Sequence, residues 1–181
     1  MQSFELSILD FIQNHLRCSF LDALLPPITH LADHGEVWIL LALVLLLIRK
    51  KRRSGLAVSG ALVLDLVSCN LLIKPLVGRI RPFAVNPAVT LLVKPPLDAS
   101  FPSGHTAASF AAVGALYFMG DPLWKPALAL ALVIAFSRLY LYVHWPSDVL
   151  GGLLLGLLVG WLGAKLMRLY KKKGEETQQR D

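Results

Sequence analysis

Long apolar segments are the feature that most limits what this chain can fold into. Residues 37–48 form an unbroken apolar run, and residues 54–73 form a second, mostly apolar one. A membrane-spanning helix needs about 20 such residues. Only 17% of the 181 residues are charged, whereas soluble domains usually carry about 25%. The chain is therefore not an ordinary soluble domain, and its length leaves room for about five or six spans with short connections.

Three further apolar segments follow, at residues 105–119, 124–143 and 147–169. We therefore expect an all-α integral membrane bundle of about five transmembrane helices. The connections between the last three segments are very short, so neighbouring spans must run antiparallel. Small residues recur at four-residue intervals in the last segment and predict close approach of another helix; they are Gly152, Gly156 and Gly160.

Three regions are expected along the chain. Residues 1–35 place apolar side chains at helical spacing among polar ones, which predicts amphipathic helices at the membrane interface. Residues 36–170 form the transmembrane core, and residues 171–181 form a charged cytoplasmic tail. Within the core, residues 78–102 make the one long loop.

The basic residues predict a membrane topology and not a nucleic-acid partner. The net charge is +6, from 18 Lys and Arg against 12 Asp and Glu, but these charges gather at the ends of apolar segments. With residues 49–53 in the cytoplasm, twelve of the 18 fall on that side. The positive-inside rule then gives an external N-terminus and a cytoplasmic C-terminus. Without a targeting sequence, we expect a bacterial cytoplasmic membrane. Cys18 and Cys69 are expected to be unpaired.

Every candidate reactive side chain falls at the outward-facing end of a predicted span. Consecutive spans alternate in direction, so a scattered set would have been divided between the two faces. Lys74, Arg81 and Arg138 place three cations there, which calls for an anion. Arg79 and Lys94 are interpreted as ordinary anchors to lipid headgroups.

Two short motifs lie near these cations: the start of a helix, and a histidine that a carboxylate can hold in place. Ser103 is a plausible N-cap, and Gly104 would let an anion approach the free backbone N–H groups of the next helix. Asp148 follows His144 by four residues, so its carboxylate can hold one imidazole nitrogen and leave the other free as a nucleophile. Capping alone also explains Ser103, and the His144–Asp148 pair could simply satisfy itself. With His105 and the cations, the motifs predict a phosphoryl-transfer site.

Taken together, these residues resemble the three-part signature of the type-2 phosphatidic acid phosphatase superfamily, whose membrane members are lipid phosphate phosphatases. The matching positions are Lys74-x6-Arg81-Pro82, Pro102-Ser103-Gly104-His105 and Ser137-Arg138-x5-His144-x3-Asp148. The resemblance implies that His144 forms a phosphohistidine, that Asp148 orients it, and that His105 protonates the departing oxygen. It implies no metal cofactor. The residues that it assigns to phosphate binding are Lys74, Arg81, Ser103, Gly104 and Arg138.

The resemblance implies a hydrolase that removes the terminal phosphate of a lipid mono- or diphosphate at the outer leaflet. Four classes of substrate fit this activity: polyprenyl diphosphates such as undecaprenyl diphosphate, phosphatidylglycerol phosphate, phosphatidic acid, and the phosphates of lipid A. A lipid phosphotransferase with a hydroxyl acceptor is the alternative, and a lipid or ion transporter is less favoured because no internal repeat is present. The expected partners are the lipid substrate and membrane lipids, with no nucleic acid. The oligomeric state is left open.

Other polar residues are not assigned to the site. His30 and His34 have a spacing that can bind zinc, but no third and fourth ligands are evident, so we expect no metal site. Asp65 lies near the middle of the second predicted span, where it could hydrogen-bond a neighbouring helix or support the basic site. The predicted surface helices of residues 4–33 are expected to border the entrance used by a lipid.

Overall fold

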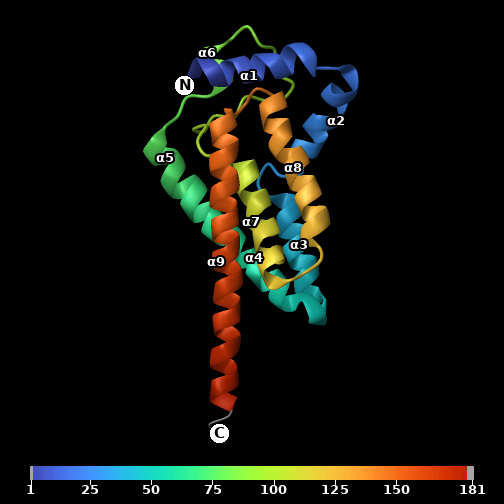
Figure 1. Ribbon diagram of the computed structural model, residues 1–181, viewed down its shortest axis with the longest axis vertical. Helices are drawn as coiled ribbons and strands as arrows, with labels where there is room; N and C mark the ends of the chain where they lie inside the picture. Colours follow the sequence, from blue (N-terminus) through green and yellow to red (C-terminus); the bar gives the residue numbers. More distant parts are fainter. Residues whose placement is uncertain (1, 179–181) are drawn as a thin grey trace.

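A computed structural model describes residues 2–178, and its regular structure over those residues is helical, which confirms the predicted all-α class (Figure 1). The helices are α1 (Gln2–His15), α2 (Ser19–His30), α3 (Glu36–Leu47), α4 (Arg52–Asp65), α5 (Lys74–Val77), α6 (Pro82–Val85), α7 (Gly104–Met119), α8 (Trp124–Tyr140) and α9 (Pro146–Gln178). A 3₁₀ helix, η1 (Arg49–Lys51), precedes α4, and a π-helix, η2 (Leu66–Ile73), joins α4 to α5. Residues 179–181 of the predicted tail lie outside the described part.

Two helical stretches are long and apolar enough to cross a membrane. They are Arg49–Val85, which includes α4, η2 and α5, and Pro146–Tyr170 of α9. Helix α3 is also apolar but has only 12 residues. All five predicted spans are therefore helical, while length and hydropathy together identify two of them among the described residues.

Helix α7 is the centre of the bundle and packs against α4, α8 and α9 (Figure 1). Its positions 109–116 are all buried, and most of them are occupied by alanine, glycine or serine. Small residues let helix backbones approach closely, which is how helices gain packing energy where lipid supplies no hydrophobic drive. The first turn of α7 is thereby held firmly among its neighbours.

The glycine stripe of α9 lies directly against α7, as the spacing predicts. A Cβ added at Gly152 would lie 2.6 Å from the carbonyl oxygen of Ser103, and one at Gly156 would collide with the carbonyl oxygen of Ala107. Only glycine permits this separation of the two backbones. The contact continues to the end of the helices, where the backbone N–H of Ser103 donates to the carbonyl oxygen of Asp148 at 3.0 Å.

Helix α1 lies across one end of the bundle, over the ends of α8 and α9 (Figure 1). Leu9 and Ile12 on its inner side are buried against the residues that connect α8 to α9. Phe4 and Phe11 remain exposed on its other side. The helix is therefore amphipathic, and the buried side faces protein.

The α7–α9 contact gives a stability prediction. We expect Gly156→Ala to lower the free energy of unfolding by about 1–3 kcal/mol, because the added methyl group must push two backbones apart. Gly60→Ala is the matched control, since a Cβ at Gly60 meets nothing within 4 Å. Thermal unfolding of both variants in detergent checks this, and equal melting temperatures would contradict the tight contact.

Candidate active site

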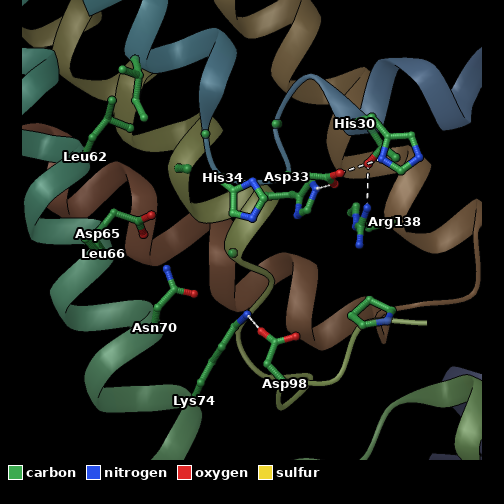
Figure 2. A pocket seen from close by; sticks show the side chains of 18 of the residues that line it. His30, Asp33, His34, Leu62, Asp65, Leu66, Asn70, Lys74, Asp98 and Arg138 are labelled. Atoms are coloured by element: carbon green, nitrogen blue, oxygen red, sulfur yellow. Dashed lines mark hydrogen bonds and ion pairs between the residues drawn. The ribbon is translucent and has the colours of Figure 1, made fainter. Parts of the chain in front are cut away.

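A cavity of about 910 Å³ opens between the α2–α3 connection, the α4–η2 segment, the first turn of α7 and the end of α8 (Figure 2). Most of the predicted site residues line it: Lys74, Arg81, Gly104, His105, Arg138 and His144. The other two, Ser103 and Asp148, are fully buried. Ser103 precedes Gly104, and Asp148 lies beside His144, so both stand directly behind the lining residues.

Arg81 is fixed in the cavity wall by backbone carbonyl groups. Its Nη1 donates to the carbonyl oxygen of Val143 at 2.7 Å, and its Nε donates to that of Asp98 at 2.9 Å. The side chain is buried, as is that of Lys74 at the start of α5. The two cations are thus held in place before any ligand arrives.

Asp98, in the long loop, bridges these two cations and was not singled out by the sequence. Its Oδ1 accepts from Arg81 Nη2 at 2.7 Å, and its Oδ2 accepts from Lys74 Nζ. Burial by itself would raise the pKa of Asp98, but hydrogen bonding and charge from Lys74 and Arg81 outweigh it and lower the pKa to about 2. The carboxylate is therefore ionised at neutral pH.

The surroundings of His144 determine which ring nitrogen is free. Arg81 Nη1 lies 3.2 Å from Nε2, and because a guanidinium only donates, Nε2 carries a lone pair and Nδ1 the proton. Nδ1 is 3.5 Å from Asp148 Oδ2, beyond ordinary hydrogen-bond length, and has no other partner among the described residues. Burial lowers the pKa of His144 well below its usual range, and Arg81, Arg138 and Lys74 add to the effect. The imidazole is neutral.

Several donors fix the carboxylate of Asp148. Oδ2 accepts from Ser100 Oγ at 2.5 Å and from the backbone N–H of Trp145 at 2.9 Å. Oδ1 accepts from Arg79 Nη1 at 2.6 Å. The carboxylate therefore cannot turn away from His144.

Arg79 is not a headgroup anchor, so that interpretation is wrong. Its side chain is 20% exposed, and besides Asp148 it donates to Ser147 Oγ and to Glu5 Oε2, each at 2.6 Å. Glu5 Oε1 accepts from the backbone N–H of Ser147 at 2.9 Å and from its hydroxyl at 2.6 Å. Burial would raise the pKa of Glu5, but the hydrogen bonds from Ser147 and Arg79 outweigh it and lower the pKa. Through this network α1 reaches the carboxylate beside His144.

His105, in the first turn of α7, is paired with a carboxylate of its own. Its Nε2 lies 3.0 Å from Asp33 Oδ1, and the other oxygen of Asp33 lies 2.6 Å from His30 Nδ1. Burial opposes ionisation of Asp33, but the two histidines outweigh it and lower its pKa. The pattern at residues 30–34 was considered only as a zinc spacing, whereas the structure uses its aspartate to contact His105.

Arg138 is also held by a residue next to the α2–α3 connection. Its Nη1 donates to Thr29 Oγ1 at 2.7 Å, and its buried Nε has no partner among the described residues. Residues 29–35 contribute several side chains to the cavity wall, whereas α1 contributes none among the residues described. Of the segment predicted to border the entrance, residues 4–33, the end of α2 and the connection after it therefore line the cavity. Helix α1 does not line it and contacts the site only through Glu5.

The start of α7 differs from the expectation in one respect. Ser103 is at the N-cap position, but its hydroxyl makes no capping hydrogen bond and instead accepts from Thr106 Oγ1 at 3.0 Å. A Cβ at Gly104 would lie 3.5 Å from Lys74 Nζ. The backbone at Gly104 therefore lies next to the Lys74 ammonium group, with no side chain between them.

The sequence model of a protein family, the PAP2 superfamily, matches residues 54–172. The chain belongs to the PAP2 superfamily. This confirms the prediction of a membrane lipid phosphate phosphatase. The matched region contains all the predicted site residues but excludes Glu5 and Asp33, which α1 and the α2–α3 connection supply.

Individual relatives of this PAP2 protein act on different lipids. It is 35% identical over 143 residues to an undecaprenyl-diphosphatase of Sulfolobus acidocaldarius, covering 75% of this chain and 67% of the relative. It is 39% identical over 137 residues to a decaprenylphosphoryl-5-phosphoribose phosphatase of Mycobacterium tuberculosis, covering 74% and 73%. The crystal structure of a transmembrane PAP2-type phosphatidylglycerolphosphate phosphatase from Bacillus subtilis superposes with a TM-score of 0.73 at 26% identity, covering 95% of this chain and 86% of that one.

The Glu5–Arg79–Asp148 network gives a second prediction. We expect Arg79→Met to lower the free energy of unfolding by about 3–5 kcal/mol, because two carboxylates lose their buried cation. Arg17→Met is the control: Arg17 pairs with Asp22 at 3.4 Å, and both side chains are about 30% exposed. We expect that change to cost at most about 1 kcal/mol. Chemical unfolding in detergent measures both, and equal losses would contradict the network.

Proposed function

We propose that this PAP2 protein hydrolyses the terminal phosphate of a lipid mono- or diphosphate through a phosphohistidine on His144. One observation carries the proposal. The lone pair of His144 Nε2 points at Arg81, inside a cavity that Lys74 and Arg138 also line. A neutral imidazole beside three fixed cations suits attack on a phosphoryl group, because the cations stabilise charge on the transferred oxygens.

In the first step, Arg81 Nη1 exchanges its hydrogen bond to Nε2 for one to a phosphoryl oxygen, Nε2 attacks phosphorus, and the imidazole becomes positively charged. Asp148 lies 3.5 Å from Nδ1, so a small movement gives the developing charge a direct carboxylate partner. The oxygens of the phosphoryl group take the place of the Asp98 carboxylate between Lys74 and Arg81. A phosphate carries more charge and more acceptor oxygens than a carboxylate, which favours this exchange.

His105 completes the reaction by moving protons. In its protonated form it donates to the departing lipid oxygen as the bond to phosphorus breaks. It then accepts a proton from the water that attacks the phosphohistidine, and phosphate leaves. The carboxylate of Asp33, 3.0 Å from Nε2, holds the ring in place for both steps.

The walls of the cavity fit a lipid substrate. Beyond the charged end, the lining is apolar and includes Ile39 and Leu43 of α3 and Leu62, Val63 and Leu66 of the facing segment. The chain of a membrane lipid can lie along this wall at little cost, because it exchanges one apolar environment for another. A short water-soluble ester would leave this part of the cavity unused.

The same proposal includes a membrane arrangement. The five spans are α3, the α4–η2–α5 segment, α7, α8 and α9, with α1 and α2 at the interface. The basic residues 49–53 and the tail 171–181 lie on the cytoplasmic side of a cell membrane, and the cavity opens on the opposite side. Its substrate is then a phosphorylated lipid of the outer leaflet.

Phosphate release from purified full-length protein tests the proposal. Lipid mono- and diphosphates are supplied in detergent micelles with a metal chelator and without an alcohol acceptor. We expect steady release of phosphate, and His144→Ala should reduce it by about 10⁴-fold or more. A labelled phosphoenzyme on another residue would overturn the assignment of His144, and release that required an added alcohol would indicate a phosphotransferase.

The pairing of His105 with Asp33 gives a prediction about the leaving group. The charged and titratable groups that face His105 are Asp33 of the α2–α3 connection, Arg138 of α8 and His144 of the α8–α9 connection. Asp33→Asn removes the only anion among them, and with it the partner that holds the ring of the proton donor. We expect kcat for an alkyl phosphate to fall by about 10–100-fold.

An aryl phosphate separates this effect from general damage. Its leaving group needs no proton, so Asp33→Asn should change kcat on 4-nitrophenyl phosphate by less than about threefold. His105→Ala should likewise lose about 10²–10⁴-fold on alkyl phosphates and much less on the aryl substrate. Equal losses on both substrates would show that Asp33 does not act through leaving-group protonation.

A further inference from the structure

Asp65 and Asn70 belong to none of the three motifs, yet they line the same cavity as the cations. The π-helix η2 is the reason. In an α-helix, five residues turn through about 500°, which would point the two side chains about 140° apart. In a π-helix, the hydrogen bond from residue i+5 closes one turn, as from the N–H of Lys74 to Cys69 O. Figure 2 shows Asp65, Asn70 and Lys74 projecting from one side of this segment.

Asp65 is buried, but one of its carboxyl oxygens has no hydrogen-bond partner. The residue is only 3% exposed, and Oδ1 accepts no hydrogen bond from the described residues. The hydrogen bond to a neighbouring helix that the sequence suggested is therefore not made by this atom. Leaving a buried carboxyl oxygen unpaired is costly, and such residues inside membrane bundles mark binding sites.

The position of the pair separates the charged end of the cavity from its apolar wall. A Cβ at Gly104 would lie 3.4 Å from Asn70 Oδ1 and 3.5 Å from Lys74 Nζ, so the amide stands next to the cation. Asp65 lies one π-turn further along, beside Leu62 and Leu66 of the apolar wall. A lipid with its phosphate at Lys74 and its chain along this wall must pass its middle part over Asn70 and Asp65.

The chemistry of the two side chains selects what that middle part can be. A carboxyl and an amide exchange hydrogen bonds with neutral hydroxyl groups. A second phosphate at this place would lose its hydration beside a carboxyl group and an amide, with no cation of its own to pair with, which is costly. The pair therefore suits a polyol or a sugar between the phosphate and the lipid chain.

We propose that Asp65 and Asn70 form a subsite for a hydroxyl-bearing, uncharged part of the substrate, so that the enzyme prefers phosphate monoesters of lipid-linked polyols or sugars to polyprenyl diphosphates. The proposal rests on the phosphatase function proposed above. The relatives' names cover both substrate classes.

Four substrates with full-length protein in micelles test the subsite. They are 1-O-dodecylglycerol 3-phosphate, which carries one hydroxyl group beside its phosphate and no second phosphate, farnesyl diphosphate, dodecyl phosphate, which has no hydroxyl, and 4-nitrophenyl phosphate. We expect Asp65→Leu to lower kcat/KM for the first by about 10–100-fold, because a buried hydroxyl loses its partner. The values for dodecyl phosphate should stay within about twofold.

A second variant and a control complete the experiment. Asp65→Asn keeps the shape and an accepting oxygen but replaces the ionisable carboxyl by a neutral amide that can donate to phosphate oxygens, so kcat/KM for farnesyl diphosphate should rise by about tenfold while that for the polyol substrate is largely retained. Ser68→Ala lies in the same π-helix, but the Ser68 hydroxyl donates to Leu64 O at 2.7 Å and does not line the cavity. It should leave all ratios unchanged.

The outcomes are separable. If wild-type protein releases phosphate but every substrate responds equally to both Asp65 variants, the subsite is overturned and the phosphatase function stands. If wild-type protein releases phosphate from none of the lipids, the proposed function fails. If Asp65→Leu also loses activity on 4-nitrophenyl phosphate, the change in selectivity of Asp65→Asn decides, and an unchanged ratio there overturns the subsite.

Discussion

The close packing of α9 on α7 is the contact on which the site depends. Glycines on α9 let the two backbones touch, and the contact continues up to the hydrogen bond between Ser103 and Asp148. The starts of both helices therefore lie side by side at one end of the bundle. One start presents His105 and free backbone N–H groups, and the other presents the carboxylate that supports His144. Side-chain chemistry at this end is set by backbone geometry further along the helices.

Carboxylates balance most of the positive charge around the cavity, in two separate arrangements. Asp98 bridges Lys74 and Arg81 within the cavity. Outside the cavity wall, Arg79 lies between Glu5 and Asp148. The two arrangements differ in kind. Asp98 comes from a loop, and in the proposed mechanism a phosphate takes its place, whereas Glu5 and Asp148 belong to packed helices and keep Arg79 as their partner.

The sequence located the motif residues better than the residues that support them. The motif residues could be found because spacing along a helix and the alternation of spans place them at one end. Glu5 and Asp33 could not be found that way. Each is a single carboxylate in an amphipathic region, and its role depends on how α1 and the α2–α3 connection fold back onto the bundle. Arg79 was misread for the same reason, since an arginine at a span end usually reaches for lipid. The helices themselves followed from hydropathy, but the π-helix did not, because residues 66–73 look like an ordinary apolar helix.

That π-helix has a consequence for how such enzymes could diverge. It accommodates one residue more per turn than the α-helix on either side. If residues 66–73 wound as an α-helix with the same number of residues, Asp65 and Asn70 would point about 140° apart, and one of the two side chains would turn out of the cavity. Substrate choice could thus change through the winding of one segment, with every motif residue intact. An alignment that scores only the motifs would not register the difference.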